Sequence, residues 1–233
     1  MKGVSLTNIQ SRPVQVIIPA MNEEKGIALT IAELDGCLTN FKVMVIDGNS
    51  GDGTVAAAKS LGATVILQEG TGKGDALFSG LKNMDNDIDY VVITDADFTY
   101  PAEFIQKMLK IVNENPKVGM VCGNRFNIEY PLDMNKVFRF GNKVIASAHT
   151  ILNGVSLSDP LTGLRVIRAD LLREWVPVST NFDIEVELNL FIKRSGFEIV
   201  EIPISYRQRI GEKKLKMKHG LTILKRIIYE CFS

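Results

Sequence analysis

The chain has 233 residues, of which 45% are hydrophobic and 23% are charged. These values are typical of one compact globular domain and exclude a disordered chain. Its 27 basic and 27 acidic residues give no net charge, which argues against general binding of nucleic acid. Three widely spaced cysteines and two histidines argue against a zinc site.

Charge is divided unevenly along the chain. Residues 1–100 carry 7 basic and 13 acidic side chains, whereas residues 101–233 carry 20 and 14. Within residues 213–226, six basic residues occur without an acid. A local positive region on a neutral protein indicates a local anionic partner.

The sequence predicts neither a secretory signal nor a membrane-spanning helix. Residues 1–5 start no apolar run, and no stretch reaches the ~20 apolar residues that cross a bilayer. We therefore expect a cytoplasmic protein, soluble or peripheral on the cytoplasmic face of a membrane.

Short apolar runs alternate with helix-length segments in the first half. The runs lie at residues 14–18, 43–46, 64–67, 90–94 and, more weakly, 118–121. Between the first two, apolar residues at 27, 31, 34 and 38 follow a helical spacing. This alternation predicts a mostly parallel sheet with helices on both faces. We therefore expect residues 12–125 to form a Rossmann-like, nucleotide-sugar-binding half.

The second half, residues 126–233, is less regular, and we expect it to bind the acceptor. Its pattern predicts a helix at 135–152, a loop at 156–165, a helix at 183–195, a strand at 199–206 and a final helix at 217–231. No repeat or low-complexity linker divides the chain. We therefore expect a single α/β domain over residues 1–233.

Two acids, Asp95 and Asp97, follow the strand at 90–94. Ligands of such sheets gather at the carboxyl ends of the strands. Carboxylates this close repel each other unless a cation or water screens them. Mg²⁺ is usually held by one or two carboxylates with substrate phosphates, and Mn²⁺ also prefers oxygen. The pair predicts a divalent metal on a diphosphate, and a solvated loop that caps the next helix is the alternative.

Two further segments follow strands. Asp47 can accept hydrogen bonds from a ribose or base edge, or can belong to a tight turn before a capped helix. Residues 70–75 lack the first glycine and the Ser or Thr of a phosphate loop. Nucleotide kinases and nicotinamide dehydrogenases are therefore disfavoured. Lys73, near a helix start, still suits an anion.

Taken together and in this order, six segments resemble those of the family 2 glycosyltransferases of the GT-A fold, and most closely the dolichyl-phosphate mannose synthase group. They are P-A-x-N-E (Pro19, Ala20, Asn22, Glu23), D-D-x-S-x-D-G-T (Asp47, Ser50, Asp52, Gly53, Thr54), G-K-G-x-A-L (Gly72, Lys73, Gly74, Ala76, Leu77), D-A-D with a later proline (Asp95, Ala96, Asp97, Pro101), D-x-x-[ST]-G-x-R (Asp159, Thr162, Gly163, Arg165) and R-x-G-x-[ST]-K-L (Arg209, Gly211, Lys214, Leu215). Three positions differ from the family pattern. Gly48 stands where the family has Asp, Thr99 stands where it often has Gln, and Lys213 stands where it has a hydroxyl residue. The likeness covers nearly the whole chain.

The resemblance implies an inverting transfer of a hexose, mannose or glucose, from a nucleotide sugar of the GDP-mannose or UDP-glucose type to a polyprenyl or dolichyl phosphate. It implies that a divalent metal, Mg²⁺ or Mn²⁺, is held by Asp95 and Asp97. The implied nucleotide-sugar-binding residues are Pro19, Ala20, Asn22, Glu23, Asp47, Lys73, Ala96, Arg209 and Lys214. The implied acceptor-phosphate residues are Arg125, Arg139 and Arg165, and the implied catalytic residues are Asp95, Asp97, Asp159 and Arg139.

The acceptor decides whether a general base is needed. A sugar hydroxyl needs one, and Asp159 is the candidate, whereas a phosphate monoester is already largely dianionic at pH 7. The basic excess after residue 120 favours the phosphate. The alternatives are a soluble or glycan hydroxyl acceptor, a sugar nucleotidyltransferase, and a nucleotide-sugar sensor without turnover.

The final segment combines an apolar face with a basic cluster. The apolar positions follow a helical spacing at Met217, Leu221, Leu224, Ile228 and Cys231. A basic amphipathic helix is typical of membrane-surface binding. A helix that covers the core and extends its lysines to solvent is the alternative.

Overall fold

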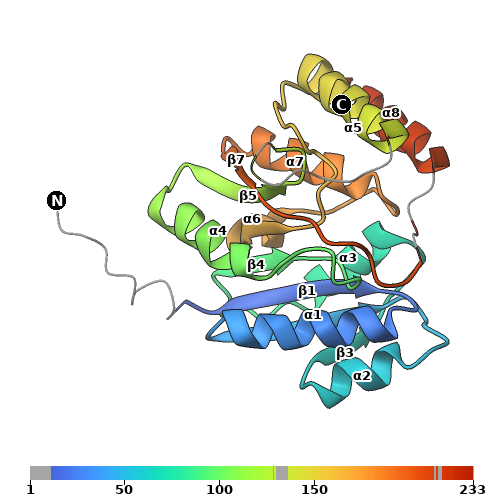
Figure 1. Ribbon diagram of the computed structural model, residues 1–233. Coiled ribbons are helices and arrows are strands. Elements are labelled where there is room, and N and C mark those ends of the chain that lie inside the picture. The colour runs from blue at the N-terminus through green and yellow to red at the C-terminus, as the bar shows by residue number, and fades with distance from the viewer. Residues whose placement is uncertain (1–11, 128, 130–135, 213, 215–216, 233) are drawn as a thin grey trace.

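A single mostly parallel sheet organises the protein (Figure 1). The computed structural model describes residues 12–127, 129, 136–212, 214 and 217–232. In these residues the sheet has seven strands in the order β3-β2-β1-β4-β6-β5-β7, and only β6 runs antiparallel to its neighbours. The strands are β1 (Val14–Ala20), β2 (Phe41–Asp47), β3 (Thr64–Leu67), β4 (Tyr90–Ile93), β5 (Val118–Asn124), β6 (Arg165–Arg168) and β7 (Glu198–Pro203).

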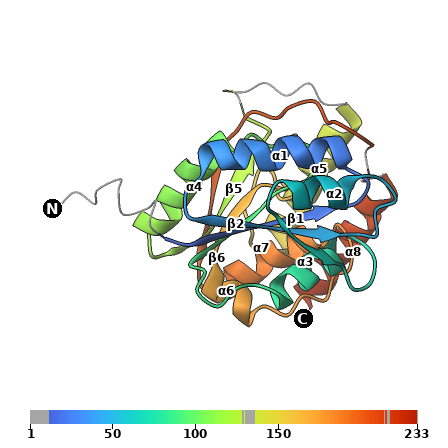
Figure 2. The same ribbon diagram turned by 90° about the horizontal axis from the view of Figure 1, so that it is seen from below.

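Helices cover both faces of the sheet, as the sequence predicts (Figure 2). They are α1 (Glu24–Cys37), α2 (Thr54–Ser60), α3 (Lys73–Lys82), α4 (Glu103–Glu114), α5 (Lys136–Asn153), α6 (Ala169–Glu174), α7 (Ile184–Arg194) and α8 (Met217–Cys231). One face packs against α1, α2 and α4, and the other against α3, α6 and α7. The single α/β domain is therefore confirmed.

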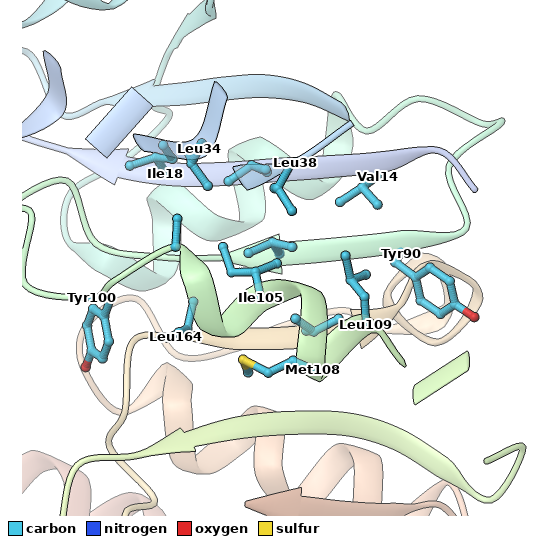
Figure 3. Packing of buried hydrophobic residues seen from close by; sticks show 14 of the residues in the cluster. Val14, Ile18, Leu34, Leu38, Tyr90, Tyr100, Ile105, Met108, Leu109 and Leu164 are labelled. Carbon is cyan, nitrogen blue, oxygen red and sulfur yellow. The ribbon is translucent and has the colours of Figure 1, made fainter. Parts of the chain in front are cut away.

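Alternation along the strands explains the two-sided burial. Val16 and Ile18 of β1 belong to one apolar cluster, while Ile17 between them belongs to the other. Because successive side chains of a strand point to opposite faces, a strand covered on both faces must be apolar throughout. Figure 3 shows part of the first cluster, in which Ile105 and Met108 of α4 lie near the sheet.

Helices α5 and α8 lie side by side beyond the sheet, next to α7 (Figure 1). Ile145 of α5, Val186 of α7 and two residues of α8, Ile223 and Ile227, form a separate small apolar cluster. Among the described residues, no helix is both long enough and apolar enough to span a membrane.

Two elements differ from the sequence-based expectation. The loop expected at 156–165 is followed at once by β6, which inserts between β4 and β5, and by the short helix α6. Strand β6 has only Val166 and Ile167 between two arginines, so its apolar run is too short to signal a strand. The last strand ends at Pro203 rather than at residue 206.

Candidate active site

The loops after β1 and β2 are tied together beside the carboxyl ends of these strands. Pro19 and Ala20 end β1, and Asn22 follows with a φ of 53°, a left-handed conformation that asparagine tolerates. The Asn22 amide donates to Ser50 Oγ (2.8 Å), and Asn22 Oδ1 accepts from the Gly51 amide (2.8 Å). The two loops therefore hold each other in place.

Asp47, the last residue of β2, has one carboxylate oxygen engaged and one without a partner. Oδ2 accepts a hydrogen bond from the Ser50 amide (3.0 Å). Oδ1 is buried and has no hydrogen-bond partner among the described residues. A buried acceptor without a partner is costly, so a ligand or water that donates to Oδ1 is expected here.

Asp95 and Asp97 follow β4, and each is paired with a basic residue of the chain. Asp95 Oδ1 lies 2.8 Å from Lys73 Nζ, and Asp97 Oδ2 lies 2.5 Å from Arg209 Nη1. Asp97 Oδ1 accepts from the amide and the hydroxyl of Thr99 (3.1 and 2.6 Å). Ala96 lies buried between the two acids.

The two carboxyls differ in their ionisation. Burial opposes the charge of Asp95, but Lys73 and then Arg209 outweigh it and hold the pKa of Asp95 below its ordinary value. For Asp97, burial and then the neighbouring Asp95 raise the pKa, although Arg209 opposes them. Two carboxylates this close repel each other, and each is stabilised by nearby positive charge. This is the electrostatic environment of a cation-binding site.

Helix α1 and the turn after Leu161 both approach these acids closely. A Cβ on Gly26 would lie 2.5 Å from the Ala96 carbonyl oxygen, and a Cβ on Gly163 would lie 2.5 Å from Asp95 Oδ2. Glycine is needed at both positions because any side chain would collide with the acidic turn. The Gly163 amide also donates to the Tyr100 hydroxyl (2.6 Å).

Lys73 bridges two carboxylates. Its Nζ lies 2.8 Å from Asp95 Oδ1 and 2.9 Å from Glu185 Oε1. The amides of Gly74 and Asp75 donate to the Thr180 carbonyl (2.9 and 3.2 Å). The first turn of α3 therefore binds the chain itself, not an anion, and the ammonium serves the acidic cluster.

Glu185 was missed by the motif analysis. It belongs to the first turn of α7 together with Glu187, where acids in the sequence signal only a favourable interaction with the helix dipole. Only the fold brings it to Lys73.

Glu23 meets the late segment that carries Arg209 and Lys214. Lys214 Nζ lies 3.8 Å from Glu23 Oε1, and Gly211, with a φ of 101°, lies directly over Glu23 Oε2. Burial raises the pKa of Glu23 to about 7, with Asp97 adding to the shift and Lys214 opposing it. The structure thus brings the expected residues Glu23, Arg209 and Lys214 together at one place. Lys213 and Leu215 lie outside the described residues.

Asp159 does not have the geometry of a general base. It is fully buried, and Arg125 Nε and Nη2 donate to its two oxygens (2.7 and 2.8 Å). The Arg125 amide donates to Oδ2 as well (3.1 Å). A general base at Asp159 therefore stays a prediction that this geometry disfavours, because both carboxylate oxygens already accept strong hydrogen bonds. The ion pair with Asp159 uses the Nε and Nη2 donors of Arg125. The Arg125 guanidinium also lies beside the rings of Tyr206 and Phe126.

Arg165 is a structural residue in this fold. Its side chain is 1% exposed and donates to the carbonyls of Thr162 (3.0 Å) and Pro160 (2.9 Å) and to Asn189 Oδ1 (2.5 Å). With its donors used inside the protein, it does not reach a surface where an acceptor phosphate can bind. Binding of an acceptor phosphate by Arg165 stays a prediction, and its burial disfavours it.

Arg139 lies exposed on α5. Among the described residues, the carboxylates of that cluster pair with Lys73, Arg209 and Lys214 and not with Arg139. Arg139 is therefore available to a ligand outside the chain.

The donor set can be tested for a divalent metal. Within the described parts of the chain, no group of three or more His, Cys, Asp or Glu side chains could hold a metal. Two carboxylates from one turn, Asp95 and Asp97, offer hard oxygen ligands. That number fits Mg²⁺ or Mn²⁺ when a substrate diphosphate supplies further oxygens. The residues present therefore fit a metal that binds together with its substrate.

Comparison with known proteins defines the class. Residues 15–176 match the model of the glycosyl transferase family 2. The chain belongs to this family and is a glycosyltransferase.

Individual relatives extend the match over nearly the whole chain. A dolichyl-phosphate hexose transferase of Haloferax volcanii is 34% identical over 222 residues, covering 94% of this chain and 93% of the relative. An undecaprenyl-phosphate mannosyltransferase of Micrococcus luteus is 29% identical and covers 87% of each. The crystal structure of glucosyl-3-phosphoglycerate synthase from Mycobacterium tuberculosis with UDP has a TM-score of 0.78 at 20% identity, over 100% of this chain and 86% of that one. This last likeness confirms the GT-A fold.

Proposed function

We propose that this glycosyltransferase moves a hexose from a nucleotide sugar to a polyprenyl phosphate. The observation that carries the proposal is the convergence of Glu23, Asp47, Asp95 and Asp97 on one edge of the sheet, with Arg209 and Lys214 beside them. The names of the relatives support the substrate classes, since two of them are called transferases to dolichyl or undecaprenyl phosphate.

The donor half uses the residues at the strand ends. Asp47 Oδ1 accepts a hydrogen bond from the nucleoside. The loop that carries Asn22 and Glu23 borders the nucleoside. Asp95 and Asp97 would hold Mg²⁺ or Mn²⁺, and the metal would supply Lewis-acid stabilisation of the diphosphate charge. Arg209 and Lys214 add positive charge from a later segment, which lies over Glu23 and Asp97.

The acceptor is a phosphate because the site lacks an available base. Asp159 is held by Arg125, and a phosphate monoester dianion needs no base to attack. Such an acceptor needs cations that orient it. Arg139, exposed on a helix without any acidic residue, is the residue that we assign to this role.

The lipid chain of the acceptor calls for a membrane surface, and we assign it to α5 and α8. Helix α5 exposes Val137, Phe140, Val144 and Ile151 at steps of three, four and seven residues, which fall on one side of a helix. Phe140 and Ile151 are 69% and 80% exposed, and Leu221 of α8 is 67% exposed.

The charges of these helices favour an anionic bilayer as the occupant. Lys136, Arg139 and Lys143 of α5 and Lys225 of α8 are exposed beside the apolar residues. The acid of α8, Glu230, is paired with Arg194 and Arg226. Apolar side chains flanked by basic ones are typical of peripheral helices. The protein then acts from the cytoplasmic face of the membrane, and its three free thiols agree with a reducing compartment.

The test is a screen of radiolabelled nucleotide hexoses against a polyprenyl phosphate, read by extraction of label into organic solvent. We expect one of GDP-mannose and UDP-glucose to label the lipid in the presence of Mn²⁺ or Mg²⁺. Arg139→Ala should raise the acceptor KM or lower kcat, with nearly unchanged affinity for the nucleotide. Label in a water-soluble glycan, or release of pyrophosphate from a nucleoside triphosphate with a sugar phosphate, would instead identify the alternative enzymes.

A further inference from the structure

Glu185 is a buried carboxylate with one oxygen unused. Its side chain belongs to the first turn of α7, and the residue is 7% exposed. Oε1 lies 2.9 Å from Lys73 Nζ, and Oε2 is buried without a hydrogen-bond partner among the described residues. A buried carboxylate oxygen that accepts nothing costs free energy of folding. A donor from outside the chain would recover that cost.

The position of Glu185 is fixed from two sides. Glu187, two residues after Glu185 in α7, accepts hydrogen bonds from the amides of Val178 and Ser179 (2.8 and 2.7 Å). It thereby holds the loop before α7. That loop packs on the start of α3, where a Cβ on Gly74 would lie 2.0 Å from the Ser179 carbonyl oxygen. Lys73 is therefore held between α7 and the acidic turn after β4.

The ligand of Glu185 must be neutral and must donate a hydrogen bond. Lys73 is shared between Glu185 and Asp95, so Glu185 lies one side chain away from the acid that we assign to the metal and diphosphate. A phosphate oxygen would be repelled by the Glu185 carboxylate. Both sugars that adjoin the diphosphate of a nucleotide sugar, the ribose and the hexose, carry neutral hydroxyl donors. Because we assign the nucleoside to Asp47, the hexose is the part that remains for Glu185.

We propose that Glu185 binds a hydroxyl of the transferred hexose through Oε2 and thereby helps to select the sugar. The assignment rests on the proposed donor site. Lys73 neutralises the carboxylate on its other oxygen and keeps it beside the diphosphate. A site built to bind a substrate hydroxyl discriminates strongly against sugars that lack or misplace it, because the buried oxygen then stays unpaired.

The test compares sugar and nucleotide binding by calorimetry in Mn²⁺, with UDP-glucose, UDP, GDP-mannose and GDP as probes. For the nucleotide sugar that the wild type prefers, Glu185→Gln should lose at least about tenfold in affinity, the equivalent of one charged hydrogen bond. Affinity for the matching nucleoside diphosphate should stay within about twofold. Equal losses for both probes would overturn the proposal, since Glu185 would then act only by holding Lys73.

Three controls keep the result interpretable. Glu187→Gln changes a buried carboxylate of the same helix that accepts the amides of Val178 and Ser179 and lies 3.9 Å from Arg226 Nη2, and it should not change the ratio of sugar to nucleotide affinity. If Glu185→Gln does not fold, Glu185→Asp retains the charge and should still shift that ratio. A wild type that binds neither UDP nor GDP would refute the donor site itself, which is a different outcome from failure of the Glu185 assignment.

A deoxy-sugar series locates the hydroxyl. For wild type, one deoxy analogue of the preferred donor should bind much more weakly than the parent, whereas Glu185→Gln should bind the two about equally. If every deoxy analogue loses as much affinity in Glu185→Gln as in wild type, Glu185 contacts no sugar hydroxyl.

Discussion

Each of the paired acids after β4 is compensated by a different part of the chain. Asp95 takes its cation from the start of α3, through Lys73, and Asp97 takes its cation from the segment after β7, through Arg209. The two proposed metal ligands are thus connected to both ends of the sheet's ligand edge. A substrate that brings a divalent cation must share these carboxylates with Lys73 and Arg209.

Asp97→Asn tests the role of this pair. The variant should lose at least ~10² in kcat, as when one preorganised electrostatic group is removed. Its unfolding temperature should stay near that of wild type, because burial and Asp95 already disfavour the charge of Asp97. Activity and thermal unfolding are measured together, with Asp35→Asn on the exposed side of α1 as control. Full activity of Asp97→Asn, or turnover in excess EDTA, contradicts the metal assignment.

Arg165→Met tests the structural role of the buried arginine. The change leaves the Thr162 carbonyl and Asn189 Oδ1 without their donor and removes one of the two donors to the Pro160 carbonyl. We expect the free energy of unfolding to fall by about 3 kcal/mol or more. The folded fraction should keep its affinity for the acceptor. Urea unfolding measures the first quantity and acceptor KM the second, and an unchanged stability with a raised acceptor KM would restore the phosphate-binding role.

His149, on the buried side of α5, gives a pH dependence of stability. Burial, and then Arg165, lower the pKa of His149 from 6.5 to about 4. Between these values the unfolded chain binds a proton that the folded chain does not, so stability falls as the pH drops from 6.5 to 4. His149→Phe lacks this group and should show a shallower decline. Urea midpoints measured across this pH range check the slope, and parallel curves for the two proteins would contradict the assignment.

At the scale of elements, α8 has both packed and exposed apolar residues, on different faces. Ile223 and Ile227 pack against α5 and α7. Of the apolar stripe expected from the sequence, Leu221, Ile228 and Cys231 stay exposed, Leu224 is half-buried, and the Met217 side chain lies outside the described residues. The periodicity of the sequence identified an apolar face, but it could not tell the packed face from the free one, because both repeat at helical spacing.

Membrane binding by this helix pair is testable with liposomes that contain anionic lipid. Lys143→Glu with Lys225→Glu should weaken co-sedimentation by about tenfold or more, since each basic residue contributes up to about 1 kcal/mol near an anionic surface. Phe140→Ser with Ile151→Ser should weaken it through lost apolar insertion. Leu67→Ser, at an exposed leucine of the edge strand β3, is the matched control. Equal sedimentation of all variants, or none by wild type, would leave α5 and α8 with a structural role alone.

The sequence predicts the regular elements better than the internal contacts. Strand β4 is apolar throughout, and β1 and β2 contain apolar runs at residues 16–20 and 43–46, so their place in a covered sheet follows from the sequence pattern. Strand β6 could not be predicted in this way, because it begins and ends with an arginine. The backbone carbonyls that accept hydrogen bonds from these arginines are brought to them only by the fold. The contact of Glu185 with Lys73 could not be predicted either, because it joins segments 112 residues apart, for which no local pattern exists.

At the scale of the whole molecule, the regions that we propose for donor and acceptor share one sheet. The acidic first half supplies Glu23, Asp47 and the pair after β4, and the basic second half supplies Arg209, Lys214 and the helices proposed to meet the membrane. Strand β6, from the second half, hydrogen-bonds to β4, which ends at the acidic turn. The two halves therefore form one continuous body, not hinged domains, and the site is assembled from both.

The most direct test of the proposed reaction compares two acceptors that differ by one phosphate. Purified protein, Mn²⁺ and the labelled nucleotide hexose identified by the screen are incubated with polyprenyl phosphate or with the free polyprenol, and lipid-extracted label is measured over time. We predict transfer to the phosphate, giving a sugar phosphodiester that mild acid cleaves, and no transfer to the alcohol. Efficient glycosylation of the free polyprenol would contradict the account, because it would require a general base that Asp159, held by Arg125, does not provide.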